Sequence, residues 1–125
     1  MINKILVVDD SSFYKKYVAE IVRELGYTNV ETASDGTEAL QIIKAGGIDL
    51  VFLDINMPVV SGVEVVESLK DFEKKPIIIM MTAVNDVLIM QRCLEQGAAN
   101  YILKNASAEA IKKIVTETCH IYDEK

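Results

Sequence analysis

The sequence is poor in the residues that build thiolate metal centres and disulfide scaffolds. Its 125 residues contain one histidine and two cysteines, Cys93 and Cys119, which lie far apart and form no CxxC motif. Thiolate metal sites and disulfide frameworks need cysteines at close or regular spacing. We therefore expect two reduced thiols and no metal site built on them, and we interpret His120 as a surface residue.

Long apolar runs and long basic blocks are missing as well. No run approaches the ~20 apolar residues of a membrane span, and MINKILVVDD lacks the apolar core and cleavage site of a signal peptide. The formal net charge is −6, whereas nucleic-acid backbones are bound by basic surfaces. These absences predict a cytoplasmic domain that contacts neither membrane nor nucleic acid directly, and whose partner is a protein or a small charged molecule.

Short apolar runs alternate with amphipathic segments over the whole length. Half of the residues are hydrophobic, which suffices for one compact core. The apolar runs predict strands over residues 4–10, 28–33, 48–54, 76–83 and 99–104. The helical spacing predicts helices over residues 12–25, 35–47, 63–72, 85–97 and 107–119. This alternation is typical of an α/β fold in which helices cover both faces of a parallel sheet.

Polar side chains follow several of these strands at the point where each strand ends. Asp9 and Asp10 end the first strand, Asp54 the third, Thr82 the fourth and Lys104 the fifth. The carboxyl ends of parallel strands share one edge of the sheet, where binding crevices of such folds lie. Adjacent carboxylates repel each other unless a cation compensates, and their hard oxygens suit Mg²⁺. The sequence therefore predicts a magnesium site beside which Asp54 is the best placed nucleophile for phosphorus.

Four short motifs make the chain resemble, over its whole length, the receiver domains of two-component response regulators. They are VVDDS at 7–11, LDINMP at 53–58 with Gly62 following, MTA at 81–83 and YILK at 101–104. The resemblance implies that residues 1–125 form one receiver domain with a flavodoxin-like, three-layer α/β/α fold. It implies five helices and a doubly wound five-stranded parallel sheet of strand order 2-1-3-4-5. It also implies a chemotaxis-regulator-like signalling protein that is no enzyme beyond assisting its own phosphorylation and dephosphorylation.

The resemblance assigns the phosphoryl acceptor and the metal ligands. Asp54 is the expected phosphoacceptor, which receives its phosphoryl group from a sensor histidine kinase or a histidine phosphotransfer protein. Asp10 is the expected direct Mg²⁺ ligand, and Asp9 is expected to hold the metal through water. Asp54 and the backbone carbonyl of Asn56 complete the expected protein ligands.

The resemblance also assigns the residues that transmit the signal. Thr82 is the expected switch hydroxyl that moves to the phosphoryl group, and Lys104 is the expected ion-pair partner of that group. Tyr101 is the aromatic residue that turns inward on activation. A downstream target protein or a second receiver then binds the altered surface.

The segment VLIM at 87–90 indicates where that surface lies. Four successive residues of a helix point almost all the way round, so one buried stripe cannot hide all of them. We expect the buried stripe to consist of Met90, Cys93, Leu94 and Gly97. Leu88 and Ile89 then face solvent near Tyr101, and these three residues are the expected partner surface.

Two positions depart from the pattern of the resembled family. Asn105 follows Lys104 where the family usually has proline, often after a cis bond. A cis bond before a non-proline residue costs about 2.5–4 kcal/mol, and the sequence leaves both forms of this bond open. Ser61 stands where aspartate usually precedes Gly62, and either side chain can cap the helix that follows.

Three other functions are alternatives. A haloacid-dehalogenase-like phosphatase also forms an aspartyl phosphate with Mg²⁺, but it requires DxDx[TV], whereas the first strand here ends in DDSSF and the third in DINMP. A flavodoxin-like mononucleotide binder requires a Ser/Thr/Gly-rich phosphate loop, and this loop is acidic. A receiver-like interaction module without phosphorylation has no need of the acceptor, metal and switch residues, which are all present.

Overall fold

Short apolar segments pair into one sheet of parallel strands. The computed structural model describes residues 2–57, 60–83 and 87–123, and within them five strands pair in the order β2-β1-β3-β4-β5. The expected fold class and strand order are therefore confirmed. The strands are β1 (Lys4–Val8), β2 (Asn29–Ala33), β3 (Leu50–Asp54), β4 (Ile77–Thr82) and β5 (Asn100–Leu103).

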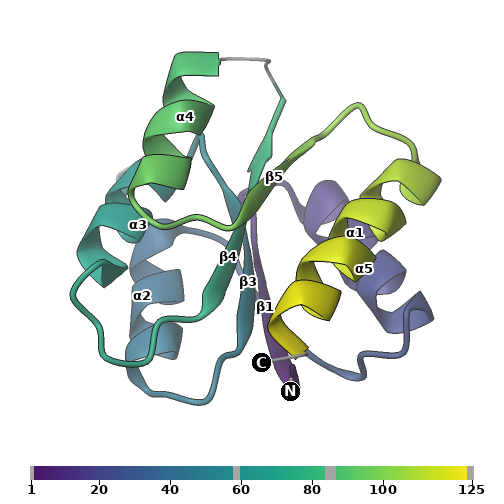
Figure 1. Cartoon of the computed structure of the whole chain (residues 1–125), viewed down its shortest axis with the longest axis horizontal. Coiled ribbons are helices and arrows are strands. Elements are labelled where there is room, and N and C mark those ends of the chain that lie inside the picture. Colours follow the sequence, from purple (N-terminus) through teal and green to yellow (C-terminus); the bar gives the residue numbers. More distant parts are fainter. Residues whose placement is uncertain (1, 58–59, 84–86, 124–125) are drawn as a thin grey trace.

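Helices alternate with these strands and cover both faces of the sheet. Those of the described residues are α1 (Ser12–Glu24), α2 (Gly36–Lys44), α3 (Gly62–Leu69), α4 (Val87–Glu95) and α5 (Ala108–Asp123). Figure 1 shows α1 and α5 on one face and α2, α3 and α4 on the other. The strands therefore form the middle of three layers.

Two apolar cores fill the spaces between the sheet and its two helix layers. In β1, Ile5 and Val7 contribute to the core beneath α1 and α5, whereas Leu6 and Val8 contribute to the core beneath α2 and α3. All four side chains are fully buried. A parallel strand covered on both faces carries a continuous apolar run, which explains why β1 shows no alternation with polar residues.

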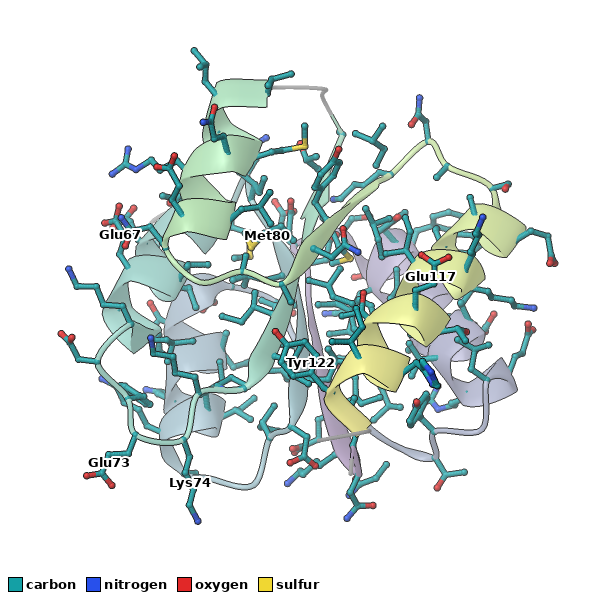
Figure 2. All side chains as sticks on the ribbon, viewed as in Figure 1. Glu67, Glu73, Lys74, Met80, Glu117 and Tyr122 are labelled. Atoms are coloured by element: carbon teal, nitrogen blue, oxygen red, sulfur yellow. The ribbon has the colours of Figure 1, made fainter. Side chains whose placement is uncertain are left out.

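Charged side chains form the outer surface of the helix layers and loops. In Figure 2, the labelled side chains of Glu73 and Lys74 point outward from the loop after α3, and both residues are exposed, as is Glu117 of α5. Met80 of β4 is fully buried. The apolar and charged residues are thus separated between interior and surface.

Side-chain caps determine where several helices begin. Ser61 and Glu64 form a reciprocal capping box at the start of α3, in which Ser61 Oγ accepts a hydrogen bond from Glu64 N at 3.2 Å. Ser11 Oγ accepts from Tyr14 N at 3.3 Å at the start of α1. The prediction that Ser61 caps the third helix in place of aspartate is confirmed.

Three helices end three or more residues from the expected position, among them α2, which ends at Lys44 rather than at residue 47. α3 ends at Leu69 rather than at residue 72, because a tighter turn follows in which Phe72 N donates to Leu69 O at 3.1 Å. α5 continues to Asp123 rather than ending at Cys119, since no glycine or proline follows to terminate it.

The buried side of α4 is rotated from the side expected. Met90 and Cys93 are buried as predicted, but Leu94 is 41% exposed and Gly97 is exposed as well. Ile89, which was expected to face solvent, is partly buried and packs against the core. The buried stripe of α4 is therefore centred on the side of Ile89 and Cys93, away from Leu94.

This rotation changes the expected partner surface in one respect. Leu88 is 78% exposed, which confirms its predicted position. The prediction that Ile89 lies toward solvent is wrong, because that side chain packs against the core. Val87 and Leu94 are exposed in its place, at 61% and 41%.

Two further observations concern the backbone. Within the described ranges no cis peptide bond occurs, so the bond between Lys104 and Asn105 is trans. In the same part of the chain, no helix combines the length and the apolar character needed to traverse a bilayer.

Candidate functional site

The three predicted carboxylates meet at the carboxyl edge of the sheet. β1 and β3 are parallel neighbours with Val8 opposite Leu53, so Asp9 and Asp54, the next residues along, come together at this edge. Ligand oxygens of Asp9, Asp10 and Asp54 all lie within 4.8 Å of one another. Asp9 and Asp54 are almost fully buried and Asp10 is exposed, so the cluster opens to solvent on the Asp10 side.

Lys104 supplies positive charge to the buried part of this cluster. Its Nζ lies 2.7 Å from Asp9 Oδ2 and 3.5 Å from Asp54 Oδ2. Asp9 Oδ1 accepts a hydrogen bond from Ser11 N at 2.9 Å, and Asp54 Oδ1 accepts one from Asn56 N at 3.2 Å. One lysine therefore contacts two carboxylates, which leaves the cluster with excess negative charge.

The second oxygen of Asp9 lacks an aligned hydrogen bond. Although Lys104 Nζ is 2.7 Å away, Asp9 Oδ2 accepts no hydrogen bond of good geometry from the described residues. The contact is an ion pair with poor hydrogen-bond geometry. Buried carboxylate oxygens normally have a partner, so this oxygen has capacity for a further cation or an ordered water molecule.

The environment of Asp54 favours its protonated form in the absence of metal. Burial, and next the negative charge of Asp9, raise the pKa of Asp54 to about 7, while Lys104 and the Asn56 N–H act in the opposite direction. A nearby divalent cation favours the ionised form of a carboxyl group. The three carboxylates and the Asp9 oxygen without an aligned partner fit a divalent cation in this cluster.

Thr82 and Lys104 meet at the same edge of the sheet. Thr82 is the last residue of β4 and is buried. Lys104 N donates to Thr82 O at 2.8 Å, which extends the ladder between β4 and β5 by one residue. A backbone hydrogen bond therefore joins the segment that carries the predicted switch hydroxyl to the segment that carries the predicted ion-pair lysine.

The other predicted site residues lie around this centre. Asn56 follows Asp54 by two residues and has an exposed side chain. Tyr101 lies in β5 opposite Met80 of β4, is half-buried and packs against the core beneath α4. Leu88 and Ile89 lie on α4, away from the carboxylates, so the expected partner surface is separate from the acidic cluster.

Sequence reasoning missed one residue of the site, Tyr14. Its ring faces Lys104, with Nζ 4.9 Å from the ring centroid. Burial, the neighbouring Tyr17, and the charges of Asp9 and Asp54 raise the pKa of Tyr14 to about 12, so the phenol is neutral. Its helical spacing identifies Tyr14 only as a core residue, and no local signal links it to a lysine ninety positions away.

Comparison with known proteins decides the family. The sequence pattern of the response regulator receiver domain matches residues 5–116. The chain belongs to the response regulator receiver domain family. It is 36% identical over 103 residues to the chemotaxis protein CheY of Treponema pallidum (strain Nichols), which covers 81% of this chain and 72% of that protein.

Solved structures of receiver domains superpose closely on this one. A structure of the CheX-CheY-BeF3-Mg²⁺ complex from Borrelia burgdorferi matches with a TM-score of 0.85 and 32% identity, covering 92% of this chain and 87% of that chain. A co-crystal structure of the Saccharomyces cerevisiae phosphotransfer protein Ypd1 and the Ssk1 receiver domain matches with a TM-score of 0.81 and 29% identity, over 93% and 88%. The chain is a CheY-like receiver domain, a signalling domain of two-component systems, as the resemblance implied.

Proposed function

We propose that this receiver domain, residues 1–125, accepts a phosphoryl group on Asp54 from a phosphohistidine. The observation that carries the proposal is the Asp54 carboxylate itself, buried within the acidic cluster with Lys104 Nζ 3.5 Å from its Oδ2. A carboxylate held in this way can attack phosphorus while the ammonium stabilises charge on the phosphoryl oxygens. The domain assists its own phosphorylation and dephosphorylation and turns over no other substrate.

The proposed transfer exchanges one bond to phosphorus for another. A bond forms between an Asp54 carboxylate oxygen and phosphorus while the bond from phosphorus to the donor imidazole breaks, and the imidazole nitrogen keeps the electron pair. Lys104 can turn from Asp54 to a phosphoryl oxygen with little movement. Thr82, at the end of the neighbouring strand, brings a hydroxyl that can donate to another phosphoryl oxygen.

The acidic cluster would hold the Mg²⁺ ion that this chemistry requires. Asp10 would bind the ion directly, Asp9 through water, and Asp54 together with the Asn56 backbone carbonyl would complete the protein ligands. When bound, Mg²⁺ supplies the positive charge that keeps Asp54 ionised and neutralises the transferring group.

The partners proposed for the domain follow from the relatives. The Ssk1 receiver domain is crystallised with the histidine phosphotransfer protein Ypd1, and the Borrelia CheY is in a complex with CheX. We infer that a sensor histidine kinase or a histidine phosphotransfer protein donates the phosphoryl group to this chain. A downstream target protein or a second receiver would recognise the product.

A phosphorylation assay with a small donor tests the proposal. With Mg²⁺ and acetyl phosphate, intact-mass spectrometry should show the addition of one phosphoryl group, and EDTA should abolish the addition. Asp54→Asn should remove it, whereas Asp71→Asn, which changes an exposed acid remote from the site, should leave it unchanged. An undiminished adduct in Asp54→Asn would rule out Asp54 as the acceptor.

A further inference from the structure

A buried tyrosine lies directly against the lysine of the site. Tyr14 is 8% exposed, and Lys104 Nζ lies 4.9 Å from its ring centroid. The Tyr14 hydroxyl has no hydrogen-bond partner among the described residues. The phenol oxygen therefore makes no visible contribution here, whereas the ring face contacts a cation.

Among the described residues, the ammonium of Lys104 contacts groups of two kinds, carboxylates and an aromatic ring. The carboxylates of Asp9 and Asp54 lie 2.7 Å and 3.5 Å away, and the ring of Tyr14 lies beside them. A lysine side chain has four flexible methylene groups, and the ion pair with Asp9 has poor hydrogen-bond geometry. The two carboxylates therefore hold the ammonium by charge, without an aligned hydrogen bond to Asp9 Oδ2.

An aromatic face adds restraint without adding a competing charge. A cation is attracted to the ring quadrupole, more strongly where water is excluded, and the Lys104 side chain is only 19% exposed. A third carboxylate would also hold the ammonium, but it would compete with an incoming phosphoryl oxygen. The ring holds Lys104 in place and leaves its N–H groups available.

The position of the ring is linked to that of Asp9 through one short turn. Ser11 N donates to Asp9 Oδ1 at 2.9 Å, and Ser11 Oγ accepts from Tyr14 N at 3.3 Å. The cap that begins α1 thus orients both the carboxylate and the ring that contact Lys104. These contacts make the ring part of the same local unit as the acidic cluster.

We propose that Tyr14 is a positioning residue, whose ring face holds the Lys104 ammonium beside Asp9 and Asp54 ready to pair with a phosphoryl group. The proposal rests on the proposed function, because pairing with a phosphoryl group matters only if Asp54 accepts one. The hydroxyl of Tyr14 is dispensable for this role. The ring is not.

Two substitutions separate the ring from the hydroxyl. Tyr14→Phe keeps the ring and Tyr14→Leu removes it. Tyr27→Leu makes the same change in a tyrosine that packs against the same core beyond the other end of α1, as a control for lost packing. In nuclear magnetic resonance spectra, the Lys104 methylene signals next to Nζ should show an aromatic ring-current shift in the wild type and in Tyr14→Phe. That shift should vanish in Tyr14→Leu and persist in Tyr27→Leu.

The rate of phosphorylation by acetyl phosphate provides a second readout. We expect the rate constant to fall about tenfold in Tyr14→Leu, which corresponds to about 1.4 kcal/mol, within the range of a partly desolvated cation–π contact. Tyr14→Phe and Tyr27→Leu should stay within about twofold of the wild type. Recovery by phenylalanine distinguishes positioning by the ring from hydrogen bonding by the phenol.

Several results would overturn the proposal. They are an unshifted Lys104 signal in the folded wild type, a wild-type rate in Tyr14→Leu, or an equal loss in Tyr14→Phe. If Tyr14→Leu does not fold, Tyr14→Met replaces it, because methionine fills the space with a long apolar side chain that has no ring. If the wild type is not phosphorylated, the proposed function fails, while the ring-current shift still decides whether Tyr14 holds Lys104.

Discussion

Asp54 is subject to opposing electrostatic influences, and their balance sets both its charge and the stability of the metal-free domain. Burial and the neighbouring Asp9 favour the neutral acid, whereas Lys104 and the Asn56 N–H favour the carboxylate. A nucleophile must be ionised, so the residue proposed to accept phosphorus is in an environment that resists its reactive form. A bound cation would favour the ionised form of Asp54, and the carboxylates of the cluster would then stabilise the folded, metal-bound domain.

Removing the charge of Asp54 should stabilise the metal-free protein. Because the pKa of Asp54 rises from 3.8 to about 7 on folding, its contribution to stability is greatest below pH 3.8 and is lost as the pH rises toward 7. Asp54→Asn should therefore raise the free energy of unfolding at neutral pH by on the order of 2 kcal/mol. Its stability should also fall less than that of the wild type between about pH 4 and pH 7.

Asp10→Asn is the matched comparison, since Asp10 belongs to the same cluster but is exposed. We expect it to raise stability in the same direction by less than about 0.5 kcal/mol, because water screens an exposed charge. Both variants should bind Mg²⁺ more weakly than the wild type. Urea titrations with EDTA or Mg²⁺ measure these effects, and a metal-free Asp54→Asn less stable than the wild type would contradict the repulsive acid cluster.

At the scale of elements, the start of α3 is packed unusually tightly against the end of β3. A Cβ atom built on Gly62 would overlap the carbonyl oxygen of Asp54 and would lie 2.8 Å from Ile55 Cα. Gly62 N also donates to Ile55 O at 2.9 Å. The backbone that presents Asp54 is therefore held by a helix that only glycine can begin at this position.

Gly62→Ala should disturb the site as well as the fold. The added methyl group must displace the backbone at Asp54 and Ile55, so we expect a loss of about 1–3 kcal/mol in the free energy of unfolding together with weaker Mg²⁺ binding. Gly46→Ala is the control, because Gly46 has φ +93° with no atom near its Cβ position. It should lower stability by about 1 kcal/mol through backbone strain and leave Mg²⁺ affinity unchanged.

Calorimetric titration of Mg²⁺ into both variants separates these effects. Equal Mg²⁺ affinities in Gly62→Ala and the wild type would mean that the close approach of α3 does not position Asp54.

The sequence predicted the elements better than their orientation about their own axes. Strand ends were predictable because buried parallel strands are apolar throughout and stop where polar residues begin, as at Asp9 and Asp54. The rotation of α4 was not, because Leu94 and Ile89 are both apolar and only packing against the sheet decides which is buried. The contact between Tyr14 and Lys104 was unpredictable for the same reason, since it forms only when two elements far apart in the sequence pack together.

At the scale of the whole molecule, the paired strands β4 and β5 connect the edge with the acidic cluster to the apolar surface on α4. Thr82 ends β4 at the edge of the sheet where the cluster lies, and the neighbouring strand β5 carries Tyr101. Tyr101 lines a hollow of about 490 Å³ with Val87, Met90, Gln91 and Leu94. A change at Thr82 would therefore reach this hollow through one neighbouring strand.

Two conformations of Tyr101 would connect phosphorylation to binding. If Thr82 moves toward a phosphoryl group on Asp54, Tyr101 can turn into the space that it leaves. A partner then shifts the equilibrium only by the difference between its affinities for the two forms. The exposed apolar residues of α4 are the part of this surface that a partner can bury.

Substitutions on this surface should weaken binding by the activated form only. With beryllofluoride and Mg²⁺ to mimic the phosphoryl group, Leu88→Ser and Tyr101→Ala should each weaken self-association or target binding at least about tenfold, since burying one leucine side chain contributes roughly 1.5–3 kcal/mol. Sedimentation velocity measures self-association. Phe13→Ser is the control, because Phe13 is 80% exposed but lies on α1, on the opposite face of the sheet. If both α4–β5 variants are phosphorylated normally and still associate like the wild type, the output surface lies elsewhere on the domain.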